Sequence, residues 1–211
     1  MGKRAMVWGA GGGIGRALVE RLADDGWRVA AVSRHPEGLE TLTDCVIVAD
    51  PADPFQVEQA VLRCAQELGE ADLWVYAAGD ILAESVGNLA VDDWQRIMNA
   101  NLTGAFIATR YSLPLLAEDA HLLYIGAYHE RLQLPGLTAY AAAKAGLQAF
   151  TTALAKEERK RRVTLLRPGA VDTPLWEKVA MRLPKDALTP EAVADTIVTC
   201  YAEGQKGVLD I

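Results

Sequence analysis

The sequence is poor in the residues and segments that mark several large classes of protein. It has only three cysteines, Cys45, Cys64 and Cys200, which are widely spaced and form no CxxC pair. This spacing favours buried thiols in a reducing compartment over disulfides or a zinc site, so we expect no metal. The sequence also lacks a run of about 18 apolar residues and a signal-peptide pattern. We therefore expect a cytoplasmic protein without a membrane anchor.

An excess of basic charge is also missing. Lys and Arg number 21 against 28 Asp and Glu, which gives a formal net charge of −7. Such an acidic balance argues against general binding to nucleic acid. The one basic run, KEERKRR at 156–162, contains two glutamates and lies late in a helical pattern, where cations suit a helix C-terminus. We expect no nucleic-acid partner.

What the sequence does contain is an alternation of short apolar runs with longer amphipathic ones. The runs VAAVS, CVIVA and LWVYAA are apolar almost throughout, as expected for strands that are buried on both faces. This alternation predicts β-α-β units, and we expect one α/β domain over 1–211 with a doubly wound, mostly parallel seven-stranded sheet of the Rossmann type. The predicted strands are Ala5–Trp8, Arg28–Ser33, Cys45–Ala49, Leu73–Ala77, His121–Ile125, Val163–Arg167 and Val208–Ile211. The predicted helices are Ile14–Asp25, Phe55–Leu68, Asp92–Leu116, Thr138–Arg161 and Pro190–Ala202.

Two of the predicted helices begin with capping signals. Asp92 or Asp93 can cap the third helix, because a short carboxylate accepts hydrogen bonds from the free N–H groups of the first turn. Thr189 followed by Pro190 is typical of an N-cap and a first helical residue.

The segment AMVWGAGGGIGRA at residues 5–17 is an apolar strand that enters a glycine run and continues as a helix. Gly9, Gly13 and Gly15 form G-x-x-x-G-x-G, a spacing that allows a tight turn, backbone approach to a pyrophosphate and close helix–strand packing. The helix that starts at Ile14 presents free N–H groups and a positive dipole to phosphates. The lysine of a P-loop is missing, which argues against an NTPase. The segment therefore predicts a dinucleotide site.

The end of the second predicted strand indicates which dinucleotide is bound. An NAD site of this type has an acidic residue about 20 positions after the glycines, to hold the ribose 2′-OH. This sequence has Ser33, Arg34 and His35 there instead. A hydroxyl and a guanidinium suit a 2′-phosphate, so we expect NADP in preference to NAD. An ordinary surface arginine is the competing interpretation.

Tyr140 and Lys144 are four residues apart in TAYAAAK, which places them on one helix face about a turn from each other. A neighbouring ammonium favours the phenolate and lowers the tyrosine pKa. The pair can then move a proton to or from a carbonyl or an alcohol. On its own, Y-x-x-x-K is a common chance pattern that a solvated helix face would explain.

Together with other motifs, this pair resembles the short-chain dehydrogenase/reductase family. The order and spacing of the motifs match the family from about residue 4 to the C-terminus. The further motifs are the glycine run, Ala78-Gly79, Asn101-Leu102-Thr103-Gly104 and Pro168-Gly169. The resemblance implies NAD(P)(H)-dependent reduction of a carbonyl or oxidation of an alcohol.

The resemblance also implies roles for individual residues. Tyr140 is the general acid–base, Lys144 holds the nicotinamide ribose and depresses the tyrosine pKa, and Asn101 holds a water that relays protons to the lysine. Asp50 contacts adenine, and Ala78 and Gly79 border the adenosine ribose. The residues expected to line the nicotinamide are Pro168, Gly169, Ala170, Val171 and Thr173.

The sequence departs from the family pattern at three places. Trp8 stands where a threonine precedes the first glycine, and Tyr76 stands where the NNAG-like motif begins with asparagine. The more serious departure is Ala127, thirteen residues before Tyr140, where the family has a serine that donates a hydrogen bond to the substrate oxygen.

Three interpretations of Ala127 are open. In the first, Tyr140 alone, or with Tyr128 or His129, polarises the carbonyl, and loss of one donor lowers the rate by roughly 10²–10³. In the second, the protein is a catalytically impaired NADP-binding sensor or assembly subunit. In the third, the loop is shifted and another hydroxyl fills the place. Because the other members of the catalytic set are present, we expect an active oxidoreductase.

The substrate pocket is expected outside the carboxyl ends of the strands. Its candidate walls are Leu175 and Trp176 in the short loop 173–184, with Leu134 and Pro135-Gly136 opposite. Few charged residues lie among these, so we expect a small or medium, apolar carbonyl or alcohol substrate. The chain is too short for the separate substrate domain of sugar-nucleotide epimerases.

The long predicted helices at 92–116 and 138–161 also suggest how subunits associate. Such helices pair across subunits in many members of the family that the sequence resembles. The alanine-rich face of the second helix permits close helix approach. That face consists of Ala141, Ala145, Ala149 and Ala153. We expect a homodimer or a homotetramer.

Overall fold

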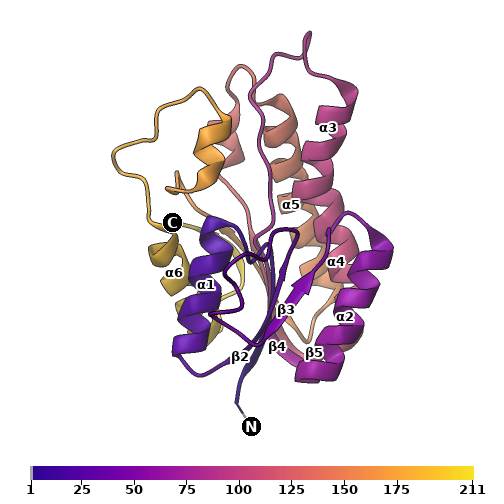
Figure 1. Cartoon of the computed structure of the whole chain (residues 1–211). Coiled ribbons are helices and arrows are strands. Elements are labelled where there is room, and N and C mark those ends of the chain that lie inside the picture. Colours follow the sequence, from indigo (N-terminus) through magenta and orange to yellow (C-terminus); the bar gives the residue numbers. More distant parts are fainter. Residues whose placement is uncertain (1) are drawn as a thin grey trace.

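The computed structural model describes residues 2–211 and contains one seven-stranded sheet (Figure 1). The strand order is β3-β2-β1-β4-β5-β6-β7, and every neighbouring pair is parallel. The strands are β1 (Arg4–Trp8), β2 (Arg28–Ser33), β3 (Cys45–Val48), β4 (Ala71–Tyr76), β5 (Leu116–Ile125), β6 (Arg162–Arg167) and β7 (Gly207–Asp210). The predicted Rossmann-type fold is confirmed, with a sheet that is wholly rather than mostly parallel.

Helices cover both faces of this sheet (Figure 1). One layer contains α1 (Gly13–Asp24) and α6 (Pro190–Glu203), and the other contains α2 (Pro54–Leu68), α4 (Gly104–Ser112) and α5 (Thr138–Glu157). Side chains of β1 alternate between the two layers. Met6 and Trp8 join the core that includes α2, α4 and α5, whereas Ala5 and Val7 join the core that includes α1 and α6. This double burial explains why the strand sequences are apolar almost throughout.

The prediction of one long helix over Asp92–Leu116 is wrong. The structure divides this segment into α3 (Val91–Met98), a π-helical turn (Asn99–Thr103), α4 and a 3-10 turn (Leu113–Leu115). The π-turn lies where the Asn101 side chain donates to the carbonyl oxygen of Ile97 at 2.9 Å, which satisfies a backbone acceptor within the widened turn. Pro114 has no N–H and cannot continue the helix, so the chain turns into β5 at Leu116.

Helix ends also differ from the predictions in part. Thr189 caps α6 as predicted, because its side chain accepts a hydrogen bond from the backbone N–H of Ala192. Neither Asp92 nor Asp93 caps α3, whose N-cap is Ala90; both carboxylates lie in the first turn, where the helix dipole favours them. The predicted helix Thr138–Arg161 ends at Glu157 rather than at Arg161. Within residues 2–211, no helix combines the length and the apolar character needed to cross a bilayer.

Candidate active site

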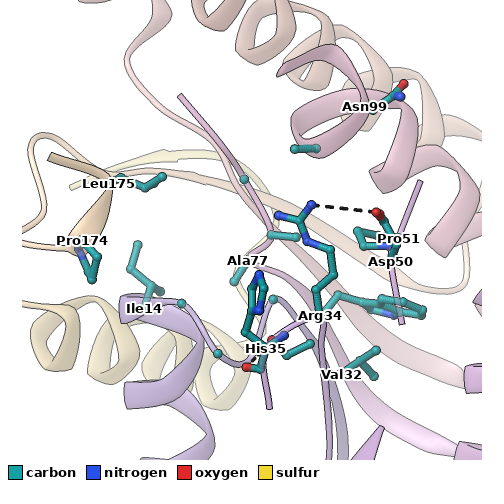
Figure 2. Close-up of a pocket in the computed structure, with 18 of the residues that line it drawn as sticks. Ile14, Val32, Arg34, His35, Asp50, Pro51, Ala77, Asn99, Pro174 and Leu175 are labelled. Atoms are coloured by element: carbon teal, nitrogen blue, oxygen red, sulfur yellow. Dashed lines mark hydrogen bonds and ion pairs between the residues drawn. The ribbon is translucent and has the colours of Figure 1, made fainter. Parts of the chain in front are cut away.

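A cleft of about 590 Å³ opens at the carboxyl ends of β1, β2 and β4, beside the N-terminus of α1 (Figure 2). Gly9 has a φ of 80°, which disfavours L side chains, and a Cβ there would overlap the backbone nitrogen of Ala78. A Cβ on Gly13 would lie 2.7 Å from Cγ2 of Thr173, and one on Gly15 would overlap the carbonyl oxygen of Gly9. No side chain caps the N-terminus of α1. Its backbone N–H groups therefore stay available to an anion, which fits the pyrophosphate of a dinucleotide.

The outer end of the cleft is formed by the residues that follow β2 and β3. Arg34 reaches toward Asp50, and their charged atoms lie 3.8 Å apart (Figure 2). The hydroxyl of Ser33 donates to the carbonyl oxygen of His35 and accepts from its N–H, at 2.9 and 3.1 Å. Because these bonds occupy the serine in its own turn, the half-exposed Arg34, loosely paired with Asp50, is the cationic side chain at this end of the cleft.

The structure brings most of the predicted cofactor residues into this one cleft. The predicted residues that line it are Gly9, Gly13, Ile14, Ser33, Arg34, Asp50, Ala78, Gly79 and Thr173. Gly15 lies beneath the turn, and Pro168, Gly169 and Val171 do not line the cleft. These last residues hold the segment after β6 in place: Gly169 N–H donates to the Ile211 carbonyl, and the Val171 carbonyl accepts from the Trp176 indole at 2.8 Å.

Gly79, Asn101 and Lys144 lie close together at the inner end of the cleft. A Cβ on Gly79 would lie 3.0 Å from Oδ1 of Asn101 and 3.9 Å from Nζ of Lys144. Asn101 is fully buried, and its Nδ2 donates to the carbonyl oxygen of Asp80 at 2.7 Å. Its Oδ1 has no hydrogen-bond partner among residues 2–211. A buried acceptor without a partner fits a site that a bound water or ligand completes.

Tyr140 and Lys144 lie on α5 at this inner end. Lys144 is only 5% exposed; its ammonium donates to the carbonyl oxygen of Ile125 at 2.9 Å and lies 5.6 Å from the centre of the Tyr140 ring. Burial lowers the pKa of Lys144 to about 8 and raises the pKa of Tyr140 to about 12. The predicted lowering of the tyrosine pKa by lysine is thus not found in the protein without cofactor, because desolvation disfavours the charged form of each group.

Comparison with known proteins accounts for this arrangement. Residues 3–183 match the family described as short chain dehydrogenase. The chain belongs to the short-chain dehydrogenase/reductase family. It is therefore an oxidoreductase of a family that uses a nicotinamide cofactor, and the resemblance inferred from the sequence motifs is confirmed.

Relatives of this short-chain dehydrogenase/reductase extend over nearly the whole chain. An uncharacterized oxidoreductase of Staphylococcus aureus (strain MW2) is 28% identical over 99% of this chain and 94% of the relative. The 3-oxoacyl-[acyl-carrier-protein] reductase of Thermotoga maritima is 29% identical over 97% and 94%. Among solved structures, a Serratia marcescens short-chain dehydrogenase/reductase has a TM-score of 0.90 at 26% identity, covering 100% of this chain and 96% of that chain. A Brucella melitensis 3-ketoacyl-(acyl-carrier-protein) reductase, solved with NADH, has a TM-score of 0.89 at 26% identity with the same coverage.

Ala127, which the motif spacing matches to the serine of the family, has a side chain that carries no donor. The two neighbours considered as substitutes have other contacts. The Tyr128 ring lies 4.7 Å from the guanidinium of Arg131 and 5.3 Å from that of Arg167. His129 lines a separate surface groove along α5, together with Ala145 and other residues of that helix. The role of Tyr140 as the donor to the substrate oxygen stays a prediction.

The expected apolar walls lie near Tyr140. Tyr140, Leu175 and Trp176 all pack against one small hydrophobic cluster. The buried members of this cluster are Ile81, Leu137 and Val179. On the opposite rim, the carbonyl oxygen of Gly136 accepts a hydrogen bond from the N–H of Glu84 at 2.9 Å. The tyrosine thus has an apolar cluster on one side, in addition to its neighbour Lys144.

Several residues of the cleft region were not predicted to belong to the site. Trp8, Arg96 and Lys178 line the cleft, and Asp80 pairs with both of these cations. Asp80 had a sequence signal, because a carboxylate directly after Ala78-Gly79 interrupts an apolar run. The two cations had none, because surface lysines and arginines are common in helices and loops.

Proposed function

We propose that this protein is an NADP(H)-dependent reductase of a small or medium carbonyl compound, with Tyr140 as the acid that protonates the carbonyl oxygen. The observation that carries the proposal is the convergence of Tyr140, Lys144 and Asn101 at the inner end of a glycine-lined cleft. Each of these groups has a proposed task in proton transfer, and the glycine turn and the N-terminus of α1 suit the pyrophosphate of a dinucleotide. Asn101 Oδ1, buried without a hydrogen-bond partner among the described residues 2–211, suits a water that returns protons to Lys144.

The protonation states favour the direction of reduction. The nicotinamide, when bound in its reduced form, supplies the hydride that adds to the carbonyl carbon. Tyr140 gives its proton to the oxygen, and a phenol with a pKa raised to about 12 is fully protonated at neutral pH, as an acid must be. Lys144, charged below about pH 8, then stabilises the phenolate that remains.

The surroundings of Tyr140 support an apolar carbonyl substrate. The cluster beside it, which includes Leu175 and Trp176, presents apolar side chains to a bound molecule. Because Ala127 provides no second donor, Tyr140 alone polarises the carbonyl. We expect turnover to be slower than with a serine at that position by roughly 10²–10³.

Arg34 supports NADP over NAD. Its guanidinium lines the outer end of the cleft, and no carboxylate lies within Ser33–His35 to bind a free ribose 2′-OH. A guanidinium forms charge-assisted hydrogen bonds with a 2′-phosphate, whereas it gains little from a hydroxyl.

Association into a homodimer or homotetramer remains part of the proposal. The exposed face of α5 bears a groove that includes Ala145, Ala149 and Ala153, small side chains that allow a second helix to approach closely. Light scattering at micromolar concentration tests this, and a monomeric mass contradicts it.

Cys45, Cys64 and Cys200 are all free and buried, which supports a reducing, cytoplasmic location.

The function is tested by incubating the purified protein with NADPH and a panel of aldehydes, ketones and quinones while following cofactor absorbance. Tyr140→Phe removes the transferable proton and keeps the ring, so turnover should disappear while NADPH binding remains. Tight NADPH binding with no turnover of any panel member, unchanged by Ala127→Ser, would contradict the reductase and indicate a sensor or an assembly subunit.

A further inference from the structure

Asp80 is a buried carboxylate that pairs with cations from two distant parts of the chain. Its Oδ1 lies 2.7 Å from Nζ of Lys178, and its Oδ2 pairs with the guanidinium of Arg96. Oδ1 also accepts a hydrogen bond from the N–H of Ile81 at 2.9 Å. Asp80 is only 4% exposed, and a carboxylate is retained at such a position only if partners compensate its desolvation. The ion pairs therefore keep Arg96 and Lys178 close to this one buried point.

The two cations come from opposite walls of the cofactor cleft. Arg96 belongs to α3, which contributes one wall, and Lys178 ends the 3-10 turn Pro174–Lys178, which contributes the other. In Figure 1, α3 and the orange segment that contains this turn stand on opposite sides above the sheet. Figure 2 shows Pro174 and Leu175 on the side facing Asn99 across the cleft. The ion pairs of Asp80 thus join the two walls.

The same turn also lies beside the reaction centre. Leu175 and Trp176 pack against the hydrophobic cluster that Tyr140 contacts, and Tyr140 itself is half-buried there. Because Pro174, Leu175 and Lys178 line the cleft, the position of this turn sets how far the cleft is open toward Tyr140. The Asp80–Lys178 pair fastens the turn in its present position.

We propose that Asp80 is a positioning residue which, through Lys178, latches the turn Pro174–Lys178 across the cofactor cleft, so that opening of this ion pair limits both the binding and the release of the cofactor. The latch rests on the proposed function in that it assumes a nicotinamide cofactor reaching Tyr140. Its mechanical part, the fastening of the turn by the ion pair, can be measured without any cofactor.

Lys178→Met is the variant that isolates the latch. It removes the charge and keeps a long apolar side chain, while Asp80 stays paired with Arg96, so no buried charge is left without a partner. Lys185→Met is the matched control, because this exposed lysine lies in the same connection between β6 and α6. Lys178→Arg should preserve the latch, since a guanidinium can also pair with the carboxylate.

The first measurement is amide hydrogen exchange of the protein without cofactor. Exchange at residues 174–181 should be at least about fivefold faster in Lys178→Met than in the wild type, because the local opening that exposes these amides becomes easier. Lys185→Met and Lys178→Arg should match the wild type. Equal exchange at 174–181 in the wild type and Lys178→Met would overturn the latch.

The second measurement is stopped-flow binding and release of NADPH, followed by cofactor fluorescence. A latch that is closed in the free protein obstructs movement in both directions. Lys178→Met should therefore raise both the association and the dissociation rate constants, each by at least about threefold. A change in the dissociation rate alone would show that Lys178 contributes affinity as an ordinary contact, which overturns the proposal. Absence of NADPH binding to the wild type would contradict the proposed function, while hydrogen exchange would still decide whether the ion pair fastens the turn.

Discussion

The burial of Lys144 makes a quantitative prediction about stability, independent of any substrate. The perturbation is Lys144→Met, which keeps the length of the side chain and removes its charge. Lys144 is 5% exposed, and its ammonium has one hydrogen-bond acceptor, the carbonyl oxygen of Ile125. A buried ammonium with so few partners destabilises the fold. The unfolding free energy of the wild type should therefore rise when Lys144 loses its proton.

The magnitude follows from the pKa. The ordinary lysine pKa of 10.5 applies to the unfolded chain, whereas burial lowers the pKa of Lys144 to about 8 in the folded protein. Between these values the unfolded state binds more protons than the folded state, so stability rises with pH. The full penalty, present below about pH 8, is roughly 3 kcal/mol at 1.36 kcal/mol per unit, and it is lost above about pH 10.5. Between about pH 7 and pH 9.5, roughly 2 kcal/mol of the penalty is relieved.

The assay is urea unfolding of the protein without cofactor, followed by tryptophan fluorescence at a series of pH values. The wild type and Lys144→Met have all other titrating groups in common. The pH dependence of the difference between their unfolding free energies therefore comes from Lys144 alone. That difference should change by about 2 kcal/mol in favour of the wild type between pH 7 and pH 9.5. Lys185→Met, at an exposed lysine, should give a curve parallel to the wild type. Parallel curves for wild type and Lys144→Met would refute the reasoning, because Lys144 would then titrate as an exposed lysine does.

Three further predictions concern the cleft and the reaction. Gly9→Ala should destabilise the fold by about 1–3 kcal/mol in urea unfolding and prevent NADPH binding, because φ is 80° and a Cβ would overlap Ala78; an unchanged midpoint would contradict this. Arg34→Met should weaken NADPH binding by about tenfold and leave NADH binding unchanged in calorimetry, since only the 2′-phosphate meets the guanidinium; equal weakening of both would speak against NADP selectivity. Ala127→Ser should raise kcat by about tenfold or more by restoring a donor to the carbonyl oxygen, and no gain would mean that the loop does not present the new hydroxyl to the substrate.

The fold could be predicted because its signals are local. Strands buried on both faces must be apolar throughout, and the runs around β2, β3 and β4 show this directly in the sequence. The helix over 92–116 was mispredicted because apolar spacing does not distinguish a continuous helix from one widened by a π-turn. Pro114 was a usable sign that the helix ends, since it cannot donate the hydrogen bond that a helix interior requires.

The candidate site could be predicted only where its residues lie close together in the sequence. The glycine turn and the Tyr140–Lys144 pair are short-range patterns, so their spacing alone indicates a phosphate cradle and a shared helix face. The pairing of Asp80 with Lys178 joins residues 98 positions apart and has no such pattern. The shifts in the pKa of Tyr140 and Lys144 were also beyond prediction, because they depend on how completely each group is removed from water.

The sequence by itself determined the residue types at the cofactor turn and the spacing of the acid and the ammonium along one helix. Both properties depend only on residues a few positions apart in the sequence. Regular secondary structure fixes the geometry of such close neighbours. Only the tertiary structure decided which charges are buried, which groups stay protonated, and which segment lies against Tyr140. Burial and ion pairing depend on side chains that packing brings together from distant parts of the chain, and the free energy of a charge changes most when water is excluded from it.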